Sequence, residues 1–496
     1  MSYNIIESKP KSYCGIFGIF GSETASIDTY YGLHALQHRG QEASGIITLS
    51  KNGDSRKTLN VIRGEGLVSE VFSDFTILSK TLQGNIAIGH NRYSTTGASH
   101  SRKNIQPFFV NYRMGNLAIA HNGNLTNERR LRTQLVEDGA IFQTSSDTEV
   151  ILHLIARSRK NTPLEQIRDA LSQIEGAYCL LILTDQGLFA ARDPYGFRPL
   201  SLGKKGSSLM VASETCAFDI NKGEYIREIR PGEIILIDDQ SVASGAPFSF
   251  DLTDNFPVKK QCIFEFIYFS RPDSKIFGHN VDKVRRRLGK ILARNYPVTD
   301  PDGEKVIVIS VPDSSNTAAI GYASELEKNG ISSKFELGLI RSHYIGRTFI
   351  APGQQKREMD VRIKFNVVKG VLENRTVVVI DDSIVRGTTS LQLIQLINEA
   401  KPKSVHLRIS SPPIMFPCYY GMDFPSHQEL IAHKVNGDIE KIREYLNVDS
   451  LKYLNTNEML EAIYEESPDD FCISCFQGQY PTDVDFTFKK EVYENR

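Results

Sequence analysis

The chain has 496 residues, of which 40% are hydrophobic and 24% are charged, and its formal net charge is −1. This length predicts two or three domains, and the near-neutral charge argues against bulk binding of nucleic acid, which usually requires a basic excess. No stretch approaches the ~20 apolar residues of a membrane-spanning helix, and the first residues lack the apolar core of a secretory signal. Seven cysteines in so long a chain do not indicate a disulfide scaffold, so a reducing cytoplasm is the expected compartment.

Cys14 opens the first apolar run, which has the pattern of a short strand, after a polar, mixed segment. A buried structural thiol is the usual explanation for a cysteine in that setting. The alternative is that residues 1–13 are a propeptide whose removal leaves Cys14 as the mature N-terminus. Its free α-amine, with an ordinary pKa of about 7.7–8.0, would then serve as the base for its own thiol.

Four polar segments follow in the first half of the chain, and each alone has the composition of a loop: residues 38–45, 89–97, 121–125 and 145–149, the last of which opens an apolar-periodic helix. Together with Cys14, their order and content resemble the class II glutamine amidotransferases. The resemblance implies an N-terminal-nucleophile glutaminase domain over residues 14–245, in which Cys14 attacks the glutamine amide and releases ammonia.

The same resemblance assigns the partners of the nucleophile. Glutamine is a zwitterion, so its α-carboxylate needs a guanidinium and its α-amine a carboxylate; Arg92 and Asp147 match those family positions. The tetrahedral oxyanion needs preorganised donors, and the Asn122 side chain and the Gly123 N–H match them. Arg39 is expected near the site without a firm role.

Downstream of Asp147 the chain alternates strand-like runs with turns: residues 178–184, 187–193, 208–213 and 233–239. Residues 192–196 have the composition of a tight surface turn. Cys179 and Cys216 are interpreted as packing residues. The polar segment 241–254 suits a connection between domains.

The second half is organised around residues 376–390, TVVVIDDSIVRGTTS. An apolar run typical of a buried strand is followed by Asp381 and Asp382, a small-residue loop and a helix start at Thr388 or Thr389. The helix N-terminus favours an anion, and the carboxylates are suited to ribose hydroxyls and a divalent cation. Most strand-to-helix turns carry no such chemistry, but two consecutive aspartates there are much rarer.

This segment resembles the 5-phosphoribosyl diphosphate (PRPP) loop of the type I phosphoribosyltransferases. The resemblance implies that Asp381 and Asp382 face the ribose and that the following loop holds the 5-phosphate, through Ser383, Arg386, Gly387, Thr388 and Thr389. The strand 305–312 and its exit loop 312–316 match the pyrophosphate loop of that family. Ser314 stands at a magnesium-ligand position there, so one Mg²⁺ per subunit is expected on Ser314, Asp381 and Asp382.

Two basic stretches flank these loops. Residues 341–362 have the composition of a mobile surface loop; the resemblance adds that this lid closes over PRPP and excludes water, with Arg347 and Lys364 facing the diphosphate. Residues 281–296 form a basic amphipathic pattern, and we interpret its charges as a solvated face.

Four cysteines form a further candidate set. Cys472 and Cys475 are a CxxC pair, which alone indicates zinc, a redox pair or an iron–sulfur cluster. With Cys262 and Cys418 they match the ligands of a [4Fe–4S] cluster in one branch of the amidophosphoribosyltransferase family. One structural cluster per subunit is the expectation, and zinc in the same cage is the main competitor.

Residues 262–274 resemble the interdomain segment of that same family, with Tyr268 at the interface between the two sites. The resemblance to its cluster-containing branch spans nearly everything after residue 13. It implies an α+β glutaminase domain of αββα layers, followed over residues 255–496 by an α/β phosphoribosyltransferase domain with a parallel sheet and a C-terminal cluster-binding segment.

The implied reaction converts PRPP, glutamine and water to 5-phosphoribosylamine, glutamate and diphosphate. This is the first step of de novo purine (IMP) biosynthesis. Because ammonia in bulk water would be protonated and lost, a transient apolar path between the sites is expected. The resemblance also implies feedback inhibition by purine nucleotides and a homotetramer.

Two alternatives come from other classes. Another class II amidotransferase, such as a glucosamine-6-phosphate synthase, would share the first half, but its isomerase domain would lack the acidic loop. A PRPP-sensing regulatory protein would keep that loop but would have no use for Cys14, Arg92, Asn122 and Asp147.

Overall fold

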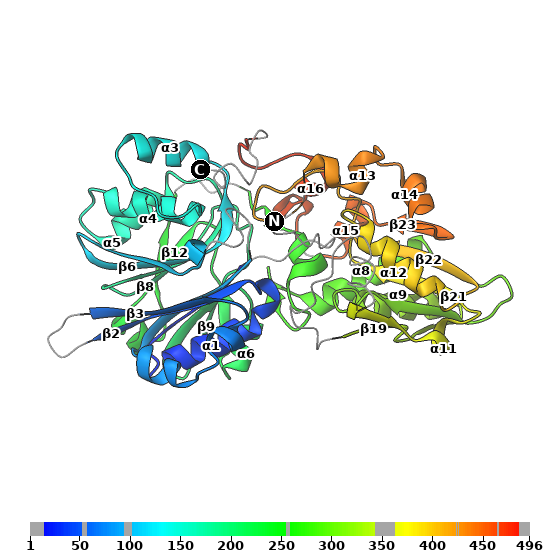
Figure 1. The fold of residues 1–496 in the computed structure, drawn as a ribbon, viewed down its shortest axis with the longest axis horizontal. Helices are drawn as coiled ribbons and strands as arrows, with labels where there is room; N and C mark the ends of the chain where they lie inside the picture. Colours follow the sequence, from blue (N-terminus) through cyan, green and yellow to red (C-terminus); the bar gives the residue numbers. More distant parts are fainter. Residues whose placement is uncertain are drawn as a thin grey trace.

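The computed structural model describes residues 14–51, 57–93, 102–253, 258–342, 363–422, 424, 426–463 and 466–485. The expected propeptide, Arg347 and most of the expected lid lie outside the described residues. Figure 1 shows two units side by side, the blue-to-green N-terminal half and the green-to-orange C-terminal half.

The first unit contains two antiparallel sheets. Within the described ranges, one sheet has seven strands in the order β11-β9-β10-β1-β4-β2-β3. Their bounds are β1 (Gly15–Phe20), β2 (Ala43–Lys51), β3 (Lys57–Glu65), β4 (Ile86–Arg92), β9 (Ser201–Lys205), β10 (Ser208–Ala212) and β11 (Glu224–Glu228). The other has six, β13-β12-β8-β7-β6-β5. These are β5 (Phe108–Tyr112), β6 (Gly115–Leu125), β7 (Gly176–Thr184), β8 (Leu188–Arg192), β12 (Glu233–Ile237) and β13 (Phe248–Asp251).

These sheets pack face to face, and helices cover both outer faces. The apolar residues between the sheets come from strands of both, such as Ile16 and Leu181, which are fully buried. The first sheet is covered by α1 (Ala25–Ala35), α2 (Val68–Val71) and α6 (Cys216–Ile220), and the second by α3 (Glu128–Glu137), α4 (Asp147–Arg157) and α5 (Pro163–Leu171). The expected αββα layering and the four expected strands are confirmed.

Two local expectations are wrong. The segment 241–254 is not only a connection, because it contains the end of α7 (Asp239–Ser244) and all of β13, which pairs with β12 at the sheet edge. The turn at 192–196 is not at the surface: Arg192 and Asp193 are fully buried. The Tyr195 carbonyl there accepts the N–H of Lys260, so the turn belongs to the junction between the units.

The second unit is built on a parallel sheet. In the part that the structure describes, five strands run in the order β18-β17-β21-β22-β23, all parallel. They are β17 (Val306–Ser310), β18 (Ser333–Phe335), β21 (Thr376–Asp381), β22 (Ser404–Ile409) and β23 (Ser450–Tyr453). Each β21 side chain is buried because helices lie on both faces. One face packs on α8 (Val281–Asn295) and α9 (Asn316–Lys328), the other on α12 (Thr388–Asn398) and α14 (Ile439–Leu446).

The remaining elements are short. A two-stranded ribbon of β19 (Leu339–Arg341) and β20 (Phe365–Val367) is followed by α11 (Lys369–Leu372). Shorter pieces are β15 (Lys275–Ile276), β16 (His279–Asn280), α13 (Ile431–Lys434) and α15 (Thr456–Glu461). The C-terminal segment, with α16 (Ser474–Gln477), lies between the two units in Figure 1.

That segment ties the units together. Its short strand β24 (Phe471–Cys472) pairs in parallel with β14 (Gln261–Cys262). Phe197 of the first unit stacks on Tyr420 of the second, with ring centroids 4.1 Å apart. None of the described helices has the length and apolarity to cross a membrane.

Candidate active site

Cys14 lies directly before β1 and is only 6% exposed. It lines a small pocket whose other walls come from both sheets and from the N-terminus of α4. The lining residues are Cys14, Arg92, Tyr93, Asn104, Gln106, His121, Gly123, Ser146 and Asp147. The structure therefore brings four of the expected glutaminase residues, Cys14, Arg92, Gly123 and Asp147, to one cavity.

Strand pairing explains this convergence. Gly15 of β1 stands opposite Asn91 of β4, which places Cys14 beside the end of β4 at Arg92 and Tyr93. The Cys14 thiol lies 3.5 Å from the Tyr93 carbonyl oxygen, to which it donates. Asp147 is the first residue of α4, and its carboxylate accepts the N–H of Leu125 at the end of β6.

Burial controls the reactivity of the thiol. It raises the pKa of Cys14 to about 12, and the nearby Arg92 guanidinium only partly offsets that effect. A thiol with this pKa is protonated at neutral pH and is a weak nucleophile. Its hydrogen-bond partner, the Tyr93 carbonyl, cannot accept its proton in a reaction. Burial therefore does not activate this thiol, whereas a base beside it would.

Asn122 and Gly123 have the properties of an oxyanion hole. Asn122 is fully buried in β6, and neither its amide nitrogen nor its amide oxygen has a hydrogen-bond partner among the described residues. Such an orphan costs about 1–3 kcal/mol, so it is usually retained for a ligand or for catalysis. At Gly123 a Cβ would lie 2.0 Å from the Ala177 carbonyl oxygen, so only glycine fits beside the pocket.

Arg92 and Asp147 give the pocket its two opposite charges. Burial would raise the pKa of Asp147, but His121 and the Leu125 N–H outweigh burial and hold that pKa below its ordinary value. Burial lowers the pKa of Arg92, whose ordinary value is so high that the group remains a cation. A guanidinium and a carboxylate across one small cavity suit a ligand with both an α-carboxylate and an α-ammonium group.

Sequence reasoning missed the residues that support Asp147. His121 lies in the pocket wall with Nδ1 3.1 Å from Thr148 Oγ1 and 3.6 Å from a carboxylate oxygen of Asp147. The side chain of Gln106 accepts the His121 N–H at 2.8 Å and donates to Thr148. The only available signal was the position of His121 beside Asn122, because Gln106 lies in no recognisable motif.

Arg39 lies next to Cys14, as expected. Its side chain is 1% exposed, and its Nε donates to the Cys14 carbonyl oxygen at 3.3 Å. The same guanidinium pairs with Glu214 of the first unit and with Glu265 of the interdomain segment. Arg39 thus connects the backbone of Cys14 with the junction.

The second expected site lies at the carboxyl edge of the parallel sheet. Asp381 ends β21, and both Asp381 and Asp382 are at most 2% exposed. Ser314, at the exit of β17, donates its hydroxyl to Asp382, and Ser383 donates to the other oxygen of Asp382 at 2.7 Å. Because neighbouring parallel strands end at one edge, the two loops meet, and the three expected Mg²⁺ ligands lie together.

The loop after the aspartates leads into α12 as expected, with Gly387 as the N-cap residue. Gly387 has φ +79°, and a Cβ there would lie 2.6 Å from Ile431. Thr388 and Thr389 form the first turn of α12. The Arg386 Nε lies 3.3 Å from Glu429. Lys364 is partly buried and lies directly before β20.

The four cysteines of the expected cage gather at the junction. Cys262 and Cys472 are direct partners in the β14–β24 pair. Burial raises the pKa of the Cys475 thiol well above its ordinary value, and charge interactions with Cys418, Cys262 and Cys472 raise it further. Across the described ranges, however, no three His, Cys, Asp or Glu side chains are arranged closely enough to hold a metal ion.

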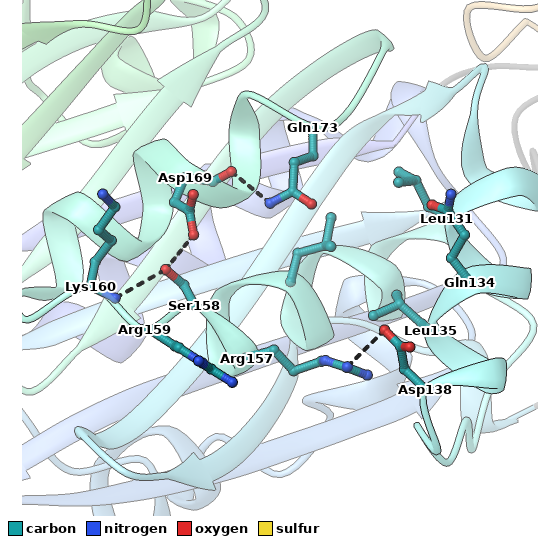
Figure 2. Close-up of a pocket in the computed structure, with 11 residues that line it drawn as sticks. Leu131, Gln134, Leu135, Asp138, Arg157, Ser158, Arg159, Lys160, Asp169 and Gln173 are labelled. Atoms are coloured by element: carbon teal, nitrogen blue, oxygen red, sulfur yellow. Dashed lines mark hydrogen bonds and ion pairs between the residues drawn. The ribbon is translucent and has the colours of Figure 1, made fainter.

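A larger cavity, of about 530 Å³, lies elsewhere, between α3, α4 and α5 (Figure 2). Its floor is leucine, and its rim carries ion pairs such as Arg157 with Asp138, 2.8 Å apart. None of the expected site residues lines it. Size alone therefore does not make it the active site.

Known proteins resemble this chain in both its N-terminal and its C-terminal half. A model of the glutamine amidotransferase domain matches residues 90–219. The amidophosphoribosyltransferase of Bacillus subtilis is 48% identical over 475 residues, covering 95% of this chain and 94% of that protein. Its counterpart in Methanocaldococcus jannaschii is 44% identical over 486 residues, covering 95% and 98%.

Solved structures agree over the same length. The glutamine PRPP amidotransferase of B. subtilis, complexed with ADP and GMP, has a TM-score of 0.85 and 46% identity, and the match covers 95% of this chain and 98% of that one. A structure described as the allosteric regulatory enzyme of purine biosynthesis has a TM-score of 0.86 and 46% identity, covering 95% and 97%. The similarity therefore spans both units and their junction.

Proposed function

Because the chain belongs to the amidophosphoribosyltransferase family, we propose that its glutaminase reaction runs at Cys14 and its transfer reaction at Asp381 and Asp382. The enzyme forms 5-phosphoribosylamine from PRPP and glutamine in purine biosynthesis. A different class II amidotransferase or a PRPP sensor is disfavoured, because relatives that match 95% of this chain are named as amidophosphoribosyltransferases.

In the glutaminase reaction, Arg92 and Asp147 orient glutamine through its α-carboxylate and α-ammonium groups. The Cys14 sulfur attacks the side-chain amide, and the oxyanion that forms accepts hydrogen bonds from the Asn122 amide and the Gly123 N–H. Ammonia leaves, and water hydrolyses the glutamyl thioester. The observation that carries this assignment is the orphaned, fully buried Asn122 beside the thiol pocket.

In the transfer reaction, the chain positions PRPP rather than attacking it. The N-terminus of α12 and Thr388 and Thr389 bind the 5-phosphate, and the acidic pair accepts from the ribose hydroxyls. Ser314, Asp381 and Asp382 fit a hard divalent cation by their oxygen chemistry, and Mg²⁺ bound there would neutralise charge on the leaving diphosphate. The experiment that tests both roles is a matched assay with glutamine and with ammonium as nitrogen donor.

We further propose that residues 1–13 are removed. The support is chemical, because the buried thiol of Cys14 needs a base and a free α-amine at the same residue would provide one. The mass of the purified, active protein should correspond to a chain that starts at Cys14. Active protein that keeps Ser2 would contradict the proposal.

We also propose that the four cysteines hold a [4Fe–4S] cluster with a structural role. The thiols of Cys262, Cys418, Cys472 and Cys475 suit such a cluster by donor type and number. It would fasten the C-terminal segment across the junction, and neither half-reaction moves electrons. Iron and sulfide analysis of anaerobically purified protein tests this; stoichiometric zinc without sulfide would show the competing metal.

Regulation and assembly complete the proposal. A relative of known structure was solved as a complex with ADP and GMP, which supports inhibition of this enzyme by purine nucleotides. We also infer a cytoplasmic homotetramer with a glutaminase domain from about residue 14 and a phosphoribosyltransferase domain from about residue 255. Light scattering at the protein concentration of the activity assay, with and without GMP, measures the oligomeric state.

A further inference from the structure

The most informative residue outside both sites is Arg285 of α8. The sequence pattern places it among charges on a solvated face, but its side chain is 2% exposed. Its Nε donates to the Phe266 carbonyl at 2.7 Å, and its two terminal nitrogens donate to the Ser270 carbonyl at 2.8 Å and the Ser314 carbonyl at 3.5 Å. One buried guanidinium therefore holds the interdomain segment and the pyrophosphate loop together.

On one side, Arg285 leads to the expected PRPP site. Ser314 donates its hydroxyl to Asp382, and Asp382 is the carboxylate with the strongest favourable charge interaction with Arg285. Burial lowers the pKa of Arg285 to about 10, and Asp382 partly counteracts that effect. Arg285 is thus linked to the acidic pair through Ser314 and by charge.

On the other side, Arg285 leads to the nucleophile. The Ser270 hydroxyl donates to Glu265 at 2.8 Å, and the other oxygen of Glu265 accepts from Arg39 at 2.8 Å. Arg39 in turn donates to the Cys14 carbonyl at 3.3 Å. A sequence of polar contacts therefore runs from Cys14 to Asp382 across the junction; it is buried from Cys14 to Arg285 and partly buried at Ser314.

The composition of this network makes it sensitive to change at either end. Glu265 and Ser270 are at most 1% exposed, so water cannot replace a lost partner. In a low-dielectric interior, removing one member of a charged network leaves the others uncompensated, and such networks respond as a unit. A ligand that changes the charge at Asp382 therefore changes the energy of the contacts that hold Cys14.

We infer that Arg285 is a positioning residue that couples the two sites. It holds the pyrophosphate loop against the interdomain segment and, through Glu265 and Arg39, sets the position of Cys14. This inference rests on the proposed function, because it takes the acidic pair as the PRPP site. By linkage, PRPP should raise the affinity for glutamine by the same factor as glutamine raises the affinity for PRPP.

The test uses Arg285→Lys in the full-length protein, with Arg286→Lys as the matched control. A lysine keeps the charge but cannot donate to three carbonyls in a fixed fork. Arg286 is the next residue of α8, and its side chain is 41% exposed and pairs with Asp282 on the same helix. The measurement is kcat/KM for glutamine hydrolysis with and without saturating PRPP and Mg²⁺.

We expect PRPP to raise kcat/KM of the native enzyme and of Arg286→Lys by the same factor. In Arg285→Lys that factor should fall by about fivefold or more, the usual lower range of coupling between sites. A folded Arg285→Lys with the native factor would overturn the inference, and so would a native enzyme that does not respond to PRPP. Failure of the native enzyme to use PRPP with ammonium would instead overturn the proposed function.

A second variant covers the case in which Arg285→Lys does not fold. Ser270→Ala removes only the hydroxyl that donates to Glu265, and it keeps every ion pair and the backbone carbonyl that accepts from Arg285. It should lower the PRPP response by a smaller factor and leave the ammonium-dependent rate near native. An unchanged response in Ser270→Ala, together with misfolding of Arg285→Lys, would assign Arg285 to folding alone.

Discussion

The two candidate sites of this chain are built in opposite ways. The thiol site is a small pocket on the strands of two antiparallel sheets, where Asn122 is buried and its side chain makes no hydrogen bond with the described residues. The acidic site lies on loops at the edge of a parallel sheet, where Asp382 is already bonded by Ser314 and Ser383. In the thiol site, the Asn122 side chain is available to bind a substrate. In the acidic site, a ligand of Asp382 must replace the hydrogen bonds from Ser314 and Ser383.

This difference suits the two substrates. Glutamine is small, and a small pocket with one cation and one anion suits its two charged groups. PRPP is large and highly charged, so its site needs backbone donors, carboxylates and room for a cation at a loop edge. If the two sites are also separate in function, a change at one site should leave the activity of the other near native.

The sharpest separation is expected from Cys14→Ala. Loss of the nucleophile should reduce glutamine-dependent synthesis by about 10⁴-fold or more, because catalysis then depends on binding and the oxyanion hole alone. Synthesis with added ammonium should persist near the native rate. Parallel assays of 5-phosphoribosylamine formation with each donor measure both.

Cys216→Ala is the matched control, since Cys216 is also buried but lies outside the pocket. It should retain both activities. If Cys14→Ala lost the ammonium-dependent rate as well, with its fold intact, the separation of the two sites would be wrong.

The reverse loss is expected from the double variant Asp381→Asn, Asp382→Asn. Removing both charges should lower transfer from either donor by about 10²-fold or more, because charge stabilisation at such a site is worth several kcal/mol and each 1.36 kcal/mol is a factor of ten. Basal glutaminase should remain. Coupled assays of glutamate and diphosphate release distinguish the two rates, and equal loss of both would contradict the assignment.

The sequence predicted the architecture well because its signals were local. The run Val377–Ile380 and the helix start at Thr388 predicted β21 and α12, and the layers of both units followed from the resemblance. Cys14, Arg92, Gly123 and Asp147 converge on one pocket, although residue spacing alone contains no information that brings β1, β4, β6 and α4 together.

The burial of polar residues that belong to no motif could not be predicted from the sequence. Arg285 has the same local pattern as its exposed neighbour Arg286, and only the docking of residues 265–270 onto α8 buries it. Asp193 likewise has the composition of a surface turn until residue 260 pairs with that turn. Such positions depend on contacts between segments far apart in the chain.

A smaller effect on the first site should come from Asn122→Ala. Loss of one oxyanion donor typically costs about 10²–10³ in kcat. The KM for glutamine should change little, because Asn122 is assigned to the transition state and Arg92 and Asp147 to binding. The ammonium-dependent rate should be native, and the protein should not be destabilised by more than about 1 kcal/mol, since Asn122 makes no side-chain hydrogen bond with the described residues.

A steady-state comparison of kcat and KM with the native enzyme tests this split. A large rise in KM with unchanged kcat would move Asn122 from the oxyanion hole to substrate binding. Asp381 variants should instead change both kcat and KM, because Asp381 is assigned both to binding the ribose and to holding the cation.

The smallest effect concerns pH and the contacts between the two sites. Burial would raise the pKa of Glu265, but Arg39 and Arg198 outweigh it and hold that pKa below its ordinary value. The pKa of Glu214 is likewise lowered, because His38 and Arg39 outweigh burial. Each carboxyl binds its proton more weakly in the folded state, so its stabilisation is complete above the ordinary glutamate pKa of about 4.3 and is lost as pH falls toward the folded value.

The melting temperature of the native protein should therefore decline steeply below about pH 4.5, whereas Glu265→Gln should start lower at pH 7 and decline less over the same interval. The exposed Glu373 provides the control, since Glu373→Gln should keep the native slope. Differential scanning calorimetry from pH 7 to pH 3.5 measures all three. A Glu265→Gln slope equal to the native one would mean that the junction carboxylates do not carry the acid sensitivity, and that the two sites are joined by packing rather than by charge.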